Sequence, residues 1–144
     1  MKDLYLYISS NTSKDIYPDN RAANFRVRLP QTLYLQGSWS IALVDIDMPK
    51  LSDNYKPQHI IFQSSVCKPC VHKDSLDPII QRLYYSEIRK GQAVYIAQPR
   101  YLLVNNSILE VFDMHITDDL GNKVSFKEGS LECTLHLMKY VITC

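Results

Sequence analysis

The chain has 144 residues, of which 46% are hydrophobic and 22% charged, and its formal net charge is +1 at pH 7. This composition is typical of one folded domain, and no apolar run approaches the roughly 18 residues that a membrane span requires. A charge so close to neutral argues against a dedicated nucleic-acid binder, which usually carries a basic face. We therefore expect a single domain over residues 1–144, with neither a membrane nor a nucleic acid as its partner.

The first strand is predicted near the N-terminus, where Leu4, Leu6 and Ile8 alternate with Tyr5 and Tyr7. This period of two gives the strand one aliphatic and one aromatic face. The chain enters this strand directly after Met-Lys-Asp, without the apolar segment of a signal peptide. We expect a protein that is made inside the cell and is not secreted.

A second strand is predicted over residues 25–29, where three apolar residues alternate with Arg26 and Arg28. The alternation indicates a half-buried strand with its arginines in water, and Pro30 is expected to end it. Together with Arg21, these arginines form the most basic cluster in the chain. A solvated strand face is the simplest interpretation, because outward charges also discourage unwanted pairing of strand edges.

A third and longer strand follows a turn at residues 36–38 and changes phase midway. Apolar residues fall on odd positions over 39–43 and on even positions over 44–48, where Asp45 and Asp47 take the odd ones. Either a bulge turns the strand over, or its first half is buried on both faces and its second half on one. We expect a central strand of a β-sandwich that ends before Pro49.

One helix is predicted over residues 78–90. Asp77 is placed to cap it, Pro78 suits its first position, and the apolar residues that follow have helical spacing. Gly91 stands where a left-handed C-terminal cap is expected, directly after two basic residues.

The remaining segments have strand patterns, the clearest being residues 131–137, where apolar and polar residues alternate. A turn signal at residues 118–122 precedes a short strand at 124–126. Eight or nine strands and one helix predict a mainly β protein: a single-domain antiparallel β-sandwich or a barrel. The other expected strands are 59–66, 93–97, 101–104 and 108–117.

Cys67-Lys-Pro-Cys70 is the one motif with recognisable chemistry, and His72 lies close by. Two thiols at this spacing suit a redox disulfide or half of a zinc site, with Cys67, Cys70 and His72 as ligands. Cys133 and His136 do not complete such a site, since residues three apart on a strand point to opposite faces. Free thiols in a loop are the simplest interpretation, and zinc binding and redox chemistry remain the alternatives.

No other pattern indicates catalysis. The four histidines, at 59, 72, 115 and 136, are dispersed, and none accompanies a nucleophile motif. Asp118 and Asp119 are assigned to a turn, and Asp45 and Asp47 to the outward face of a strand. These residues favour a structural or binding module over an enzyme, with no catalytic residue and no cofactor.

Two stretches, residues 7–49 and 101–138, resemble a virion protein of adomaviruses, adintoviruses and related polinton-type elements. In that protein a Tyr-Pro-Asp-Asn-like loop precedes F-x-V-x-L-P and L-x-G-x-W, and D-D-x-G-x-x-V-x-F precedes a T-L-H strand; each motif occurs here in order. The resemblance implies a minor capsid or penton-like vertex protein of β-sandwich or jelly-roll type, located in the virion. Because no insertion for a fibre or receptor loop is present, a capsid cement or fibre-anchoring protein is the alternative.

Contacts with other capsid proteins and with copies of itself are expected. The tyrosine face of the first strand and the two-sided burial of residues 39–43 leave more apolar surface than one sandwich hides, which favours a homo-oligomer, a pentamer or trimer. The interface candidates are Tyr5, Tyr7, Trp39, Arg26 and Arg28.

Overall fold

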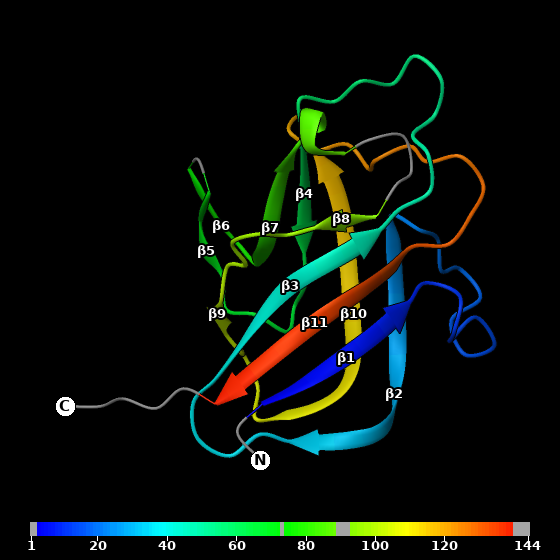
Figure 1. The fold of residues 1–144 in the computed structure, drawn as a ribbon. Helices are drawn as coiled ribbons and strands as arrows, with labels where there is room; N and C mark the ends of the chain where they lie inside the picture. The colour runs from blue at the N-terminus through cyan, green and yellow to red at the C-terminus, as the bar shows by residue number, and fades with distance from the viewer. Residues whose placement is uncertain (1–2, 73, 89–92, 140–144) are drawn as a thin grey trace.

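The computed structural model describes residues 3–72, 74–88 and 93–139 and consists of two packed antiparallel sheets (Figure 1). The sheet nearer the viewer, called the front sheet, has the order β1-β11-β3-β8, and β9 also pairs with β3. Its strands are β1 (Asp3–Ser9), β3 (Trp39–Asp47), β8 (Val94–Tyr95), β9 (Leu102–Leu103) and β11 (Glu132–Lys139).

The second sheet, called the back sheet, has the order β2-β10-β4-β7 (Figure 1). Its strands are β2 (Asn24–Tyr34), β4 (His59–Gln63), β7 (Ile79–Tyr84) and β10 (Ile108–Asp118). A separate hairpin, drawn beside the back sheet, pairs β5 (Cys70–His72) with β6 (Ser75–Asp77).

The strand order is that of a jelly roll. The chain alternates between the sheets from β1 to β4, forms the β4–β7 pair within the back sheet, and alternates again through β8, β10 and β11. Each late strand thereby enters between two early ones: β11 between β1 and β3, and β10 between β2 and β4. The expected mainly β, antiparallel sandwich is confirmed.

The helix expected over residues 78–90 is wrong. Residues Ile79–Tyr84 form β7 and pair antiparallel with β4, and only a 3-10 turn, Tyr85–Glu87, follows them. The expected C-terminal cap at Gly91 lies outside the described residues. Pairing with β4 satisfies one side of the β7 backbone and buries its two isoleucines and Leu83, so tertiary contacts override the local helical spacing.

The phase change predicted in β3 is confirmed as a bulge. The register of β3 against β11 shifts in the middle of the strand and leaves Val44 as the extra residue, while residues 39–43 are all buried. The bulge turns the strand over, so that Asp45 and Asp47 lie on the outer face of the front sheet and Ile46 stays in the core.

Pro30 does not end β2, which continues to Tyr34. The pairing of β2 with β10 shifts between Leu109 and Val111, and Pro30 lies opposite this irregularity. A residue without an N–H is tolerated there because the ladder is already interrupted.

The core lies between the two sheets and is apolar. The segment expected as a strand at 124–126 forms no strand and contributes one isolated bridge, between Leu51 and Phe126. None of the described residues belongs to a helix with the length and hydropathy needed to cross a membrane. The largest fully buried side chains include Phe25, Ile41, Phe62, Phe112, Met114 and Leu131.

Candidate functional site

The outer face of the front sheet carries exposed tyrosines. Leu4, Leu6 and Ile8 of β1 face the core, so Tyr5 and Tyr7, which alternate with them, point outward, and Tyr7 is 80% exposed. Strand register continues the aromatic surface across the sheet, because Tyr7 lies opposite Thr134, Thr134 opposite Asp45, and Asp45 opposite Tyr95. Tyr95 is also 80% exposed. The tyrosines at both edges of the front sheet therefore share one surface.

Acidic side chains lie on the same surface. Glu132 of β11 is directly opposite Asp47 of β3, one cross-strand row beyond Asp45. Asp45, Asp47 and Glu132 form no ion pair or hydrogen bond through their carboxylates with any described residue, and they border an open hollow of about 460 Å3 beside Tyr7. We call this surface the acidic tyrosine face; its members are Asp3, Tyr5, Tyr7, Asp45, Asp47, Tyr95, Tyr101 and Glu132.

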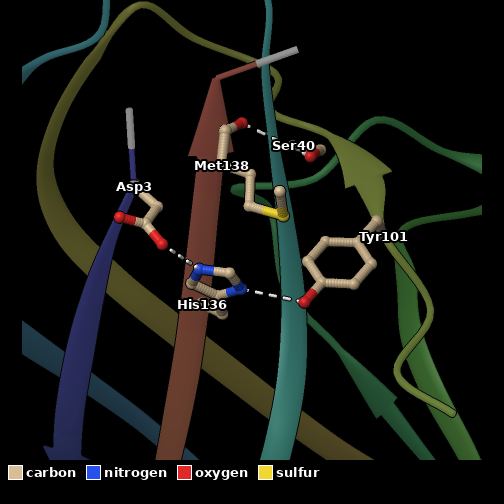
Figure 2. Close-up of polar contacts among 5 residues, drawn as sticks. All are labelled: Asp3, Ser40, Tyr101, His136 and Met138. Carbon is tan, nitrogen blue, oxygen red and sulfur yellow. Dashed lines mark hydrogen bonds and ion pairs between the residues drawn. The ribbon is translucent and has the colours of Figure 1, made fainter. Parts of the chain in front are cut away.

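His136 lies beneath this surface at the centre of a hydrogen-bond chain (Figure 2). Its Nε2 is 3.1 Å from Oδ2 of Asp3, and its Nδ1 is 2.8 Å from the hydroxyl oxygen of Tyr101. The ring of Tyr5 stacks on the imidazole with 4.4 Å between the ring centroids, and His136 is only 8% exposed. With the tautomer that satisfies both neighbours, Tyr101 donates to Nδ1 and Nε2–H donates to Asp3.

The hydrogen bonds of His136 tie together three parts of the fold: the edge strand β1, the central strand β11 and the segment before β9. Burial raises the pKa of the Tyr101 hydroxyl, and repulsion from Tyr5 once it is ionised and from the Asp3 carboxylate adds to the shift. A phenol with a raised pKa keeps its proton at neutral pH and donates a hydrogen bond. The arrangement therefore holds Tyr5 and Tyr101 in place on the acidic tyrosine face.

Two of the expected interface residues, Arg26 and Arg28, lie on the opposite side of the molecule. They are exposed on β2. Arg82 of β7, which is paired with Ile61, also points outward, because its neighbour Leu83 points into the core and side chains alternate along a strand. None of the three guanidinium groups forms an ion pair with a described residue. We call this surface of the back sheet the arginine face; its members are Arg26, Arg28, Arg82, His59 and Tyr84.

Two acids of β10 lie near the arginine face: Asp113, which is opposite Arg26, and Glu110, which is exposed in the bulge beside Val111. The hydrogen bonds of Asp113 are the clearest. Its Oδ1 accepts hydrogen bonds from the Ser65 hydroxyl at 2.6 Å and from the Ser65 backbone N–H at 3.1 Å. The loop after β4 thus holds this carboxylate, and the three arginines outnumber the two acids on this side of the sheet.

Trp39, another interface candidate, is a core residue. It is 8% exposed, and its indole N–H donates to the carbonyl oxygen of Gln36 at 3.0 Å. It has little surface to offer a partner, so neither face includes it.

The Cys67–Cys70 motif is partly buried, and its two thiols are free. Cys67 is fully buried, and its Sγ lies 3.3 Å from the carbonyl oxygen of Ser64. Cys70 lies in β5, and its Sγ lies 3.5 Å from the carbonyl oxygen of Asp77. Burial raises the pKa of the Cys67 thiol to about 11, which disfavours the thiolate that redox chemistry requires.

The third candidate ligand, His72, has its side chain outside the described residues. Among the side chains that are described, no cluster of three or more His, Cys, Asp or Glu is arranged for a metal ion. Cys133 and His136 lie on opposite faces of β11, as their spacing predicts: Cys133 is in the core and His136 beneath Tyr5.

The His136 chain was not predicted from the sequence. Asp3 and His136 are 133 positions apart, and only the pairing of the first and last strands brings them together. No local spacing signals such a pair. By contrast, the turn role assigned to Asp118 is confirmed, since its Oδ1 accepts from the backbone N–H groups of Leu120 and Asn122.

Comparison with known proteins gives no identity: no protein-family model matches the chain, and no curated protein matches it. Jelly rolls occur in viral capsid, lectin and cupin domains, and a fold alone does not choose among these functions. The function must therefore be argued from the two surfaces.

Proposed function

We propose that this protein is a structural component of a virus particle, a minor capsid or penton-like vertex protein that acts through protein contacts and catalyses no reaction. The observation that carries the proposal is a jelly roll with two exposed, chemically distinct faces. Jelly rolls are a common architecture of viral capsid domains. The resemblance of residues 7–49 and 101–138 to virion proteins points in the same direction.

The acidic tyrosine face has the chemistry of a contact surface. Aromatic residues are enriched at protein interfaces, and tyrosine offers a large rigid contact area at a low cost in conformational entropy. Tyr7 and Tyr95 are mostly exposed, and Leu103 and Met138 add apolar area on the same side of the sheet. A partner that covers this face buries aromatic surface, while the acidic residues that lie between the tyrosines set its orientation.

The partners in this proposal are other capsid proteins and copies of the same chain, assembled as a pentamer or trimer. A capsid cement protein or a fibre anchor uses the same kind of surface at another place in the particle. Cryo-microscopy of the particle separates these roles, because each one places the chain at a different position relative to the vertex.

The test is whether the chain is part of the particle. Particles are purified from the source that encodes the chain, and their proteins are quantified by mass spectrometry against an abundant host protein as a contamination marker. We expect a fixed copy number per particle that survives repeated gradient purification. A chain that is abundant in infected cells and absent from particles overturns the proposal.

The Cys67–Cys70 motif is tested separately, because zinc binding or redox chemistry is the rival function. We expect the purified protein to contain less than stoichiometric zinc and the double variant Cys67→Ser/Cys70→Ser to assemble like the native chain. Bound zinc together with lost assembly in the double variant contradicts this expectation, since a structural metal stabilises the segment that binds it.

A further inference from the structure

The two faces of the sandwich carry opposite charges. Outward positions of the front-sheet strands hold four acidic residues and, among the described residues, no lysine or arginine. Outward positions of the back-sheet strands hold three arginines and Asp113, and Glu110 is exposed in the bulge of β10, so arginines outnumber acids on this side. The formal charge of the whole chain is +1, so the separation lies in the placement of charges and not in the composition.

These charges have few partners within the molecule. Asp45, Asp47 and Glu132 are unpaired among the described residues, as are the guanidinium groups of Arg26 and Arg28. The acidic residues accompany exposed tyrosines, and arginine binds carboxylates through two parallel hydrogen bonds and stacks on aromatic rings. Within this chain, the Arg82 guanidinium already lies 6.0 Å from the ring centroid of Tyr84.

We propose that the arginine face of one copy docks on the acidic tyrosine face of a second copy. Contact between two identical faces opposes acid to acid or arginine to arginine, and like charges across an interface are repulsive. Contact between the two different faces brings opposite charges together on both sides. The inference rests on the proposed contact function and names its first partner, a second copy of the chain.

The contact is heterologous, because each copy uses one face to bind and leaves the other face open. Such contacts repeat from copy to copy and close into a ring when the rotation between copies allows it. Because the two faces lie on opposite sides of the sandwich, this contact stacks copies in a row and is separate from the closed pentamer or trimer of the proposed function.

A charge-swap experiment tests the docking. One variant carries Arg26→Glu and Arg28→Glu, and the other carries Asp47→Arg and Glu132→Arg. Self-association of each protein is measured by sedimentation at micromolar concentration and low salt, after circular dichroism has confirmed the fold. Lys50→Glu/Lys56→Glu is the matched control, since it makes the same charge change as the arginine variant in an exposed loop outside both faces.

We expect the native chain and the lysine control to associate and each swap variant alone to associate at least about tenfold more weakly. An equimolar mixture of the two swap variants regains association, because each altered face then meets its complement. High salt weakens association of the native chain. A native chain that stays monomeric, a swap variant that associates normally alone, or a mixture that stays monomeric overturns the inference.

The outcome is independent of the particle test. Lost self-association with the chain still present in purified particles removes only the second copy as a partner. Self-association with the expected charge swap, but no chain in particles, removes only the virion role.

Discussion

The two sheets have similar inner faces and different outer faces. Phe112 of the back sheet and Leu135 of the front sheet are both fully buried in one apolar core. Outside, the front sheet carries tyrosines and unpaired acids over a buried histidine, and the back sheet carries arginines. Because the inner faces need only apolar residues of the right volume, the outer faces are where this jelly roll acquires its individual properties.

Two histidines show how far this difference extends. His136 and His115 both occupy outward positions on central strands, His136 in the front sheet and His115 in the back sheet. His136 is buried and bonded at both ring nitrogens, while His115 is partly exposed and forms no side-chain hydrogen bond with a described residue. The front sheet thus has a buried polar network outside the core, and the back sheet has no equivalent at the corresponding histidine.

The largest expected effects test the similarity of the inner faces. Phe112→Ala is expected to lower the free energy of unfolding by about 3–5 kcal/mol and Leu135→Ala by about 2–5 kcal/mol, because each leaves a cavity in a close-packed core. Unfolding in urea measures both, with Tyr95→Ala as the exposed control, expected within about 0.5 kcal/mol of the native chain. A cost below about 1 kcal/mol for either core variant contradicts a core shared equally by the two sheets.

The next effect separates the two histidines. His136→Ala is expected to cost about 1–3 kcal/mol, because Tyr101 and Asp3 lose their common partner. His115→Ala is the matched control and is expected to change stability by less than about 0.5 kcal/mol. Equal costs for the two variants, again from urea unfolding, show that the chain through His136 does not stabilise the front sheet.

A smaller effect on stability is expected from removing one of the hydrogen bonds of His136. Tyr101→Phe keeps the ring and removes the hydroxyl that lies 2.8 Å from Nδ1 of His136. The expected cost is about 0.5–1.5 kcal/mol, that of one hydrogen bond. Tyr95→Phe is the control, since the Tyr95 hydroxyl bonds to no described residue. If Tyr101→Phe is as stable as Tyr95→Phe, the hydroxyl of Tyr101 does not hold the segment before β9.

The smallest effect is in the pH dependence of stability. Burial raises the pKa of Tyr101 in the folded chain, so above about pH 10, where unfolded tyrosine ionises, the folded state binds more protons. Stability from this group is complete below that pH and is lost as the pH rises through the folded pKa. We expect the alkaline loss of stability to be less steep in Tyr101→Phe than in the native chain, with exposed Tyr7→Phe unchanged. Identical slopes contradict the raised pKa.

The sequence predicts those parts of the fold that local patterns determine. The switch of apolar residues from odd to even positions in β3 requires the bulge at Val44, and the same pattern places Asp45 and Asp47 outside. The error at β7 has the opposite origin: Pro78 and the spacing that follows suit a helix locally, but the exposed edge of β4 pairs with this segment. Strand pairing between distant segments overrides the local preference, and no single-chain pattern reveals it.

The acidic tyrosine face is also predictable only in part, because local patterns indicate some of its residues and strand pairing decides the others. The alternation around Tyr5 and Tyr7 indicates an outward aromatic face without further information. That Tyr95 and Glu132 join it depends on strand register, and the bond between His136 and Asp3 depends on pairing of the first and last strands. The strand pattern predicts excess apolar surface and so makes Trp39 an interface candidate, but the core accommodates its side chain.

The position of β11 between β1 and β3 has a consequence for biosynthesis. In the front sheet, β1 and β3 have no direct pairing with each other, so both keep unsatisfied edges until β11 has left the ribosome. The same holds for β2 and β4, which wait for β10. Emerging strands with open edges are sites of aggregation, and pairings distant in sequence form slowly. The sandwich therefore cannot form before β10 and β11 emerge, and a ribosome-stalled chain that lacks them presents the unpaired inner edges of β1, β2, β3 and β4 to chaperones.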